Sequence, residues 1–189
     1  MKDEKLIADK YRWGNRKFLW YLPQYRFLFV KRKCEFHRSN SRLLFYLYRF
    51  LYEKYKVKYM MDIPAKVKIG KWLRIEHIGN IVINPEAVIG ENVTLLNGVL
   101  IGSQSRGDRK GTPIIGNSVW IGTNAIVVGK INIGNNVLIA PGAFVNFDVP
   151  DDSIVLGNPG KIIPNSNATK GYIINSIDKW LLEIVCLLI

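Results

Sequence analysis

The chain holds only two histidines, and His77 stands out as a candidate for acid–base chemistry. It follows Glu76 in the segment RIEHIGN. A neutral imidazole accepts a proton near physiological pH, so a histidine placed in a cleft can act as a general base. His77 also breaks a periodic pattern at a position where an aliphatic residue is expected. Two structural interpretations stand beside catalysis: a buried structural histidine, and a shift of register that turns the side chain outward.

The other residues that could do chemistry point away from metal sites and covalent intermediates. Cys34 and Cys186 lie far apart with no metal-ligand spacing, and His37 in CEFHRSN is expected on the surface. We expect the two cysteines to be reduced thiols of a cytoplasmic protein. Two histidines are too few for a zinc site of three histidines, so no metal is expected.

The element that must position His77 is predicted by a six-residue period. Aliphatic residues occupy two positions in each hexad, and Gly, Asn, Lys, Asp and Ser dominate between them. Such a period is typical of a parallel β-solenoid, in which each hexad supplies a short strand and a turn. The first series is Ile83, Ile89, Leu95 and Ile101 with Ala87, Val93 and Val99, and the second is Ile115, Ile121, Val127, Ile133, Ile139 and Val145 with Val119, Ala125, Ile131, Val137, Ala143 and Val149.

The two series are out of phase, because the step from Ile101 to Ile115 is not a multiple of six. Residues 102–113, GSQSRGDRKGTP, are polar and carry Arg106, Asp108, Arg109 and Lys110. A solenoid tolerates an insertion at a corner, and such insertions often form the binding face. We therefore predict an excursion loop over about 102–113.

Composition divides the chain near residue 61. Residues 1–61 hold 16 of the 22 aromatic residues and a net charge of +11, whereas residues 62–189 carry only +1. We predict a basic, aromatic-rich helical segment over 1–61, a solenoid domain over 62–163, and a C-terminal tail and helix over 164–189.

Two amphipathic helices are predicted in the first segment, over 15–33 and 41–58, with Pro23 bending or breaking the first. Their basic, aromatic surface could rest on an anionic membrane, or it could pack as a cap on the solenoid or on another subunit. No nucleic-acid-binding motif accompanies the charge. The N-terminus lacks the apolar core of a signal peptide, so we expect a cytoplasmic protein that could associate with the inner face of the membrane.

The ordered segments MDIPAKVKIG, IEHIGNIVI, AVIGENVTLLNGVLIG, IGTNAIVVGKINIGNNVLIAPGAFV and DVPDDSIVLGNPGKI resemble the serine acetyltransferase branch of the left-handed β-helix acyltransferases. The resemblance covers about residues 58–163. It implies a mainly β fold, a left-handed parallel β-helix, assembled as a homotrimer. It also implies acetyl-CoA as the donor and active sites between adjacent subunits.

The same resemblance assigns catalytic roles to three residues. His77 matches the general base, and Asp62 in DIPA matches the carboxylate that orients the imidazole. Glu76 stands where the family carries Asp, and it could share that orientation or touch the acceptor. Asp62 could instead be a turn residue beside Pro64, and Glu76 could be a solvent-exposed residue at an edge of the solenoid. The hydroxyl would attack the thioester directly, because both cysteines lie outside the repeats.

The resemblance also implies a path for acetyl-CoA between two solenoids. Lys161 in GNPGKI would pair with the phosphates of CoA. The positions that match the family's acetyl-CoA-binding residues are Gly102, Ser103, Thr123, Pro141, Asn146 and Lys161. The glycine among them could equally be a turn residue with positive φ.

The chain departs from serine acetyltransferases in the excursion, where the family's Arg-His pair is replaced within GDRKGTPII. Counting back from Pro113 places Gly111 and Thr112 at the positions of that pair, whereas aligning on Asp-Arg places Arg109 and Lys110 there. The histidine is missing in both alignments, and Arg109 and Lys110 are the candidate acceptor contacts. We therefore expect an O-acetyltransferase that acts on a sugar hydroxyl in surface-polysaccharide synthesis, on a glycan that could be lipid-linked. The alternatives are a serine O-acetyltransferase of cysteine synthesis and a trimeric scaffold at the membrane without catalysis.

Overall fold

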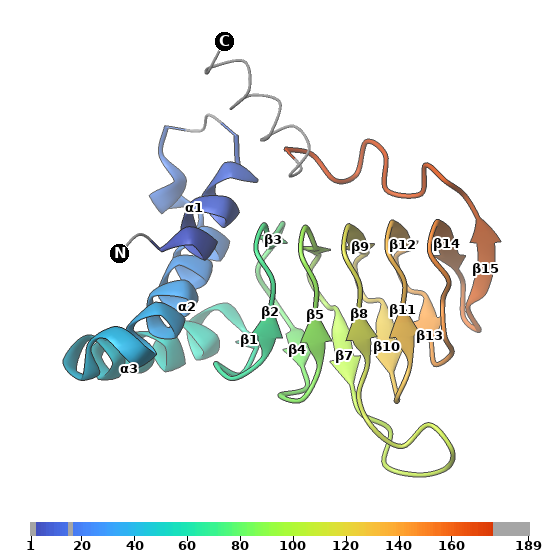
Figure 1. Ribbon diagram of the computed structural model, residues 1–189, viewed down its shortest axis with the longest axis horizontal. Coiled ribbons are helices and arrows are strands. Elements are labelled where there is room, and N and C mark those ends of the chain that lie inside the picture. The colour runs from blue at the N-terminus through green and yellow to red at the C-terminus, as the bar shows by residue number, and fades with distance from the viewer. Residues whose placement is uncertain (1–2, 15–16, 176–189) are drawn as a thin grey trace.

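The structure is a computed structural model that describes residues 3–14 and 17–175. A three-sided parallel β-solenoid follows a group of N-terminal helices that close one end of it (Figure 1). The hexapeptide-repeat solenoid predicted from the sequence is thereby confirmed.

Three sheets form the sides of the solenoid, and each complete coil contributes one strand to each sheet. Sheet A contains β1 (Met61–Asp62), β4 (Ile81–Ile83), β7 (Leu100–Gly102), β10 (Ile126–Val128) and β13 (Phe144–Val145). Sheet B contains β2 (Lys68–Ile69), β5 (Val88–Ile89), β8 (Ile114–Ile115) and β11 (Asn132–Ile133). Sheet C contains β3 (Arg74–Ile75), β6 (Thr94–Leu95), β9 (Val119–Ile121), β12 (Val137–Ile139) and β14 (Ser153–Leu156), to which β15 (Lys161–Pro164) adds as an antiparallel strand.

The aliphatic positions of the hexads line the interior of the solenoid. Every residue of both series is buried, and all belong to one continuous apolar cluster. Burying a Val, Leu or Ile side chain contributes roughly 1.5–3 kcal/mol, so the stacked column is the main source of stability in the solenoid. Asparagines in left-handed backbone conformations, such as Asn92, Asn124 and Asn136, turn the chain at corners between the strands.

The register of the sheets locates two insertions. Ile126 in β10 pairs with Phe144 in β13, so the coil between them has the length of three hexads. The coil from Met61 to its partner Ile81 is longer than three hexads by two residues, and the coil from Leu100 to its partner Ile126 is longer by eight. The two extra residues lie in the corner between β3 and β4, and the eight extra residues form the excursion between β7 and β8.

The N-terminal segment contains α1 (Glu4–Tyr11), η1 (Leu19–Tyr21), α2 (Pro23–Asn40) and α3 (Arg42–Tyr59). The helix predicted over 15–33 is not continuous, because α2 begins at Pro23, so Pro23 breaks the predicted helix and does not bend it. Proline is well tolerated in the first turn, where its missing N–H would have no helical partner. Ser41 caps α3, with its hydroxyl accepting a hydrogen bond from the Leu44 amide.

The spacing of Leu44, Leu47, Tyr48, Leu51 and Tyr55 predicts a buried apolar face for the second helix, and this prediction is only partly correct. Tyr48, Leu51 and Tyr55 do pack against the core, whereas Leu44 and Leu47 are exposed. The buried face of α3 is built instead around Tyr52, whose hydroxyl donates to the Ile63 carbonyl at 2.5 Å. A second, outward apolar face therefore remains on this helix.

The helices and the solenoid share one hydrophobic core, although composition changes sharply between them. Phe27 and Leu28 of α2 belong to the same buried cluster as Met61 and the aliphatic column. The boundary near residue 61 therefore marks a change in amino-acid composition, but the segments on its two sides share one hydrophobic core.

Two buried arginines fasten α1 and α2 to the first coils. Arg12 donates to the Trp72 carbonyl at 2.7 Å, to Asn92 Oδ1 at 2.7 Å and to Thr94 Oγ1 at 2.8 Å. Arg32 is ion-paired with the buried carboxylate of Asp9 at 2.6 Å. Burial, together with the nearby charge of Arg74, lowers the pKa of Arg12 to about 10, so Arg12 is still protonated at neutral pH.

Beyond β15 the chain crosses the outer side of sheet C. Ala168 and Ile173 pack there against Trp120 and Leu138. The predicted C-terminal helix would fall on residues 176–189, which lie outside the described residues. Among the described helices, none is both long enough and apolar enough to cross a membrane.

The Arg12 contacts predict a large stability effect. We expect Arg12→Met to lower the free energy of unfolding by about 2–5 kcal/mol, because the acceptors in the first coils lose their buried donor. Urea denaturation measures this loss. Lys10→Met, an exposed position of the same helix, is the control and should change stability little. Equal losses in both variants would contradict the role given to Arg12.

Candidate functional site

His77 lies on the surface, in the corner between β3 and β4 that is two residues longer than the hexad requires. The extra residues remove His77 from the inward series and turn its imidazole toward solvent. This is the register shift that the sequence left open, and a buried structural histidine is excluded. Within residues 3–14 and 17–175, no hydrogen bond or ion pair engages the ring, which leaves the imidazole available to a ligand.

Glu76 is held beside His77 by a residue that the sequence analysis missed. Arg74 Nε lies 2.7 Å from Glu76 Oε1, and Arg74 Nη2 donates to Oε2 at 3.0 Å. Such a two-point pair fixes the orientation of the carboxylate. The signal was present in the sequence, because residues i and i+2 of an extended segment point to the same side.

The N-terminal segment in turn holds this ion pair. Arg74 donates to the Arg12 carbonyl at 2.8 Å and its guanidinium lies 5.0 Å from the centre of the Trp13 ring. Gln24 of α2 donates to the Glu76 carbonyl at 3.0 Å. The corner that carries His77 is thus positioned by α1 and α2 as well as by the solenoid.

Asp62 is placed on the outer side of β1 and pairs with Lys56 of α3, at 2.9 Å between Oδ1 and Nζ. In the described part of the chain no bond joins Asp62 to His77, so its role as orienter remains a prediction. Asp62 does line a hollow of about 340 Å³ together with Val82 and with Asn80, which closes the His77 corner. The hollow brings the neighbourhoods of both residues to one region of the surface.

Three of the residues predicted to bind acetyl-CoA lie along the same edge as His77. We call this edge the C–A corner, because it joins each strand of sheet C to the next strand of sheet A. Backbone bonds stack its turns: Gly98 donates to Gly79, Asn124 to Asn97, and Gly142 to Thr123. Thr123 and Pro141 belong to these turns, and exposed Lys161 follows the last of them.

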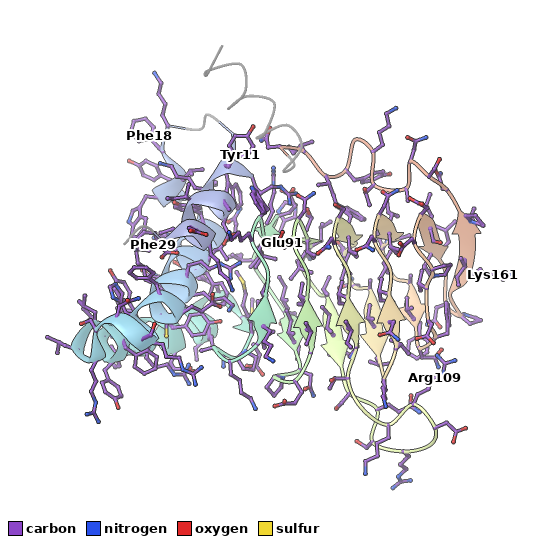
Figure 2. All side chains as sticks on the ribbon, viewed as in Figure 1. Tyr11, Phe18, Phe29, Glu91, Arg109 and Lys161 are labelled. Atoms are coloured by element: carbon purple, nitrogen blue, oxygen red, sulfur yellow. The ribbon has the colours of Figure 1, made fainter. Side chains whose placement is uncertain are left out.

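The remaining predicted residues lie at a different edge, the A–B corner, where sheet A leads to sheet B. Gly102 and Ser103 begin the excursion, which projects between β7 and β8 (Figure 1). Arg109 reaches from the excursion to the Asn146 carbonyl, to which it donates at 2.7 Å. Figure 2 shows Arg109 beside the excursion and Lys161 at the far end of the solenoid. Lys110 is exposed on the same loop.

The outer side of sheet A lies between these two corners and is apolar. Its outward column runs along paired positions Val82, Leu100, Ile126 and Phe144, all partly or largely accessible. Within one chain, His77 and the excursion are therefore on opposite edges of sheet A. A site that uses both would need a second copy of the chain.

The chemistry that the described residues offer at this corner is acid–base chemistry at His77. Burial raises the pKa of the Cys34 thiol, which makes this residue a poor nucleophile. In the described ranges, no three His, Cys, Asp or Glu side chains are grouped so that they could hold a metal ion.

Comparison with known proteins identifies the repeat. Residues 112–146 match the family described as bacterial transferase hexapeptide (six repeats). Serine acetyltransferase 4 of Arabidopsis thaliana is 39% identical over 105 residues, covering 54% of this chain and 29% of the relative. The serine acetyltransferase of Bacillus pumilus is 33% identical over 127 residues, covering 67% of this chain and 58% of the relative. The chain thus spans less than two thirds of the length of these curated relatives.

Solved structures give the same result over more of the chain. The Neisseria gonorrhoeae serine acetyltransferase in complex with serine has a TM-score of 0.67 and 30% identity, covering 85% of this chain and 66% of that one. The Brucella abortus serine acetyltransferase in complex with coenzyme A has a TM-score of 0.69 and 25% identity, covering 86% and 65%.

These comparisons correct the acceptor expected from the sequence. The expectation of a sugar hydroxyl in surface-polysaccharide synthesis is wrong, because the similar relatives and solved structures named above are serine acetyltransferases. The replaced Arg-His pair lies in a single loop, whereas the structural similarity covers 86% of the chain.

Proposed function

Because the solenoid is a serine acetyltransferase-like hexapeptide-repeat domain, we propose that this chain transfers the acetyl group of acetyl-CoA to the hydroxyl of L-serine. The observation that carries the proposal is the exposed imidazole of His77, in a lengthened corner of a solenoid similar to an enzyme solved with serine. Acetyl-CoA as donor is supported by the similar structure that contains coenzyme A.

The reaction needs one proton acceptor near the attacking hydroxyl. His77 would accept the serine proton as the hydroxyl oxygen attacks the carbonyl carbon of the thioester. The carbon–sulfur bond then breaks, and the imidazolium returns its proton to the departing thiolate of CoA. The acetyl ester of serine and free CoA are the products, and no group on the protein is acylated.

Charged residues near the two corners could recognise serine. Glu76 offers a carboxylate beside the imidazole, which suits the ammonium group of the amino acid, and Arg74 sets its orientation. Arg109 and Lys110 would supply cations for the serine carboxylate in place of the Arg-His pair of serine acetyltransferases. Asp62 is our candidate for orienting His77, and it would have to leave Lys56 to do so.

The C–A corner supports an extended path for acetyl-CoA. From the His77 turn to the turn before Lys161 there are four steps between coils, or roughly 19 Å at the usual spacing between strands. Lys161 at the far end would pair with phosphate, and Thr123 and Pro141 would contact the arm between. Gly102, Ser103 and Asn146 would contact it from the A–B corner of a neighbouring copy.

The separation of the two corners supports an assembly of several copies. His77 lies at the C–A corner and Arg109 near the A–B corner, on opposite edges of the apolar outer side of sheet A. Packing of three solenoids around a threefold axis could bring the C–A corner of one chain against the A–B corner of its neighbour. We therefore propose a homotrimer with one site at each interface.

The first prediction concerns the base. His77→Asn should lower kcat for L-serine by about 10²–10⁴-fold, because the proton acceptor is lost while the corner keeps a polar side chain of similar reach. Release of CoA, followed with a thiol reagent, measures this. His37→Asn, on the stacked His37–Tyr48 pair of α2 and α3, is the matched control and should retain activity.

Two outcomes would count against the assignment. An active wild-type enzyme whose rate survives His77→Asn would remove His77 from catalysis. A wild-type protein that folds but releases no CoA with L-serine would contradict the proposed function and favour a scaffold.

The second prediction concerns the donor. Lys161→Glu should raise the KM for acetyl-CoA about tenfold and leave the KM for serine unchanged, since it replaces attraction to phosphate with repulsion. Steady-state kinetics with each substrate varied separately make the distinction. Lys170→Glu, another exposed lysine beyond the coils, should change neither constant. A change confined to the KM for serine would relocate the donor site.

The third prediction concerns assembly. His77→Asn chains and Arg109→Ala/Lys110→Ala chains should each be nearly inactive alone. Purified mixed trimers should recover activity, up to about one third of the wild-type value, because one interface in each mixed trimer joins an intact corner to an intact excursion. No recovery in mixed trimers would show that each chain builds its site alone.

A further inference from the structure

The last described helix before the solenoid, α3, presents an apolar surface that nothing in the described chain covers. Its exposed members are 51% to 82% accessible, and their spacing on a helix of 3.6 residues per turn places them on one side. We call this surface the α3 outer face; it consists of Leu43, Tyr46, Leu47, Phe50 and Val57. Contiguous apolar surface of this kind marks an interaction site in a soluble protein.

Basic residues accompany the α3 outer face. The helix carries five Lys or Arg residues and a single acidic one, Glu53. Lys54 lies within the apolar side itself, with its ammonium 4.8 Å from the centre of the Phe50 ring. A long lysine can cover apolar surface with its methylene groups while its charge remains near anionic groups.

A basic hollow adjoins one end of this face. The turn between α2 and α3 encloses about 420 Å³, lined by Arg38 and Arg42 together with Ser39, Ser41 and Tyr46. Both arginines are exposed, and in the described part of the chain neither is paired with a carboxylate. Guanidinium and hydroxyl groups that converge on one hollow suit a phosphate oxyanion.

From these features we propose that the α3 outer face and the α2–α3 hollow bind an anionic phospholipid surface. Leu43, Leu47 and Phe50 would enter the boundary between headgroups and acyl chains, with α3 lying in the plane of the membrane. Arg38 and Arg42 would contact lipid phosphates. Because α3 leads directly into β1, the first coil and its corners would then lie close to the bilayer.

A second copy of the chain fits this surface less well. In a twofold contact through the same face, Lys54 and the flanking cations of one copy would approach those of the other copy. Like charges in a shared apolar interface are costly unless they are paired, and Glu53 is already engaged by Arg49 and Lys56. Anionic headgroups supply the opposite charge directly.

The test is sedimentation of the 189-residue protein with phospholipid vesicles. The wild type should bind vesicles that contain phosphatidylglycerol and phosphatidylcholine, and bind vesicles of phosphatidylcholine alone roughly tenfold more weakly. Binding should fall as salt is raised, because screening weakens attraction between exposed charges. Leu47→Glu/Phe50→Glu should abolish binding, whereas Ile163→Glu, an exposed apolar position on β15, should not change it.

A second pair of variants tests the hollow. Arg38→Glu/Arg42→Glu should weaken binding to anionic vesicles at least tenfold, and Arg38→Lys/Arg42→Lys should retain most of it. Lys130→Glu/Lys170→Glu, an equal change of charge at exposed sites outside the N-terminal helices, should have a much smaller effect.

Three results would overturn the proposal. The first is no binding of the wild type to anionic vesicles at low salt. The second is unchanged binding by Leu47→Glu/Phe50→Glu with the circular dichroism of the wild type. The third is an oligomer or an RNA complex that depends on Leu47 and Phe50 in the absence of vesicle binding, which would assign the surface to another partner. Acetyl transfer in solution is measured separately, so failure here leaves the proposed enzyme activity unaffected.

Discussion

The continuous aliphatic column inside the solenoid is the constraint on which the rest of this structure depends. Each hexad must present two side chains inward. Any segment of the chain that does not fit this period must leave the stacked coils at a corner. The two departures from the period are both placed in this way: two extra residues expose His77, and eight extra residues form the excursion. The candidate catalytic and binding residues are thus confined to the corners of the solenoid, because its interior is filled by aliphatic side chains.

The N-terminal segment does more than close the end of the column. The guanidinium groups of Arg12 and Arg32 are buried where α1 and α2 meet the first coils. Their positive charges are stabilised by backbone carbonyls and, for Arg32, by the Asp9 carboxylate. Through Arg74 the same network reaches Glu76, next to the candidate base. The helices that close the solenoid therefore also orient the candidate site, while the described residues leave the α3 outer face uncovered.

The division of candidate residues between two corners is the chemical reason for the trimer that we propose. One edge carries the imidazole and the turns that lead to Lys161, and the other carries the basic excursion anchored on Asn146. The apolar outer side of sheet A separates them within a chain, and the same surface is suited to contact with another solenoid. Binding and assembly would then be properties of one surface.

The sequence by itself determined the solenoid, the position of the excursion and the basic character of the N-terminal segment, because period, phase and charge are local properties that stacking preserves. It also singled out His77 as an exception, but it could not tell a buried ring from an exposed one. That depended on the length of the corner relative to the neighbouring coil, which only the paired register reveals. The start of α2 at Pro23, the choice of the buried face of α3 and the pairing of Arg74 with Glu76 were likewise decided by tertiary structure. Each depends on which surfaces meet across the chain, and α3 has apolar residues on two sides, so its own pattern could not select the side that packs.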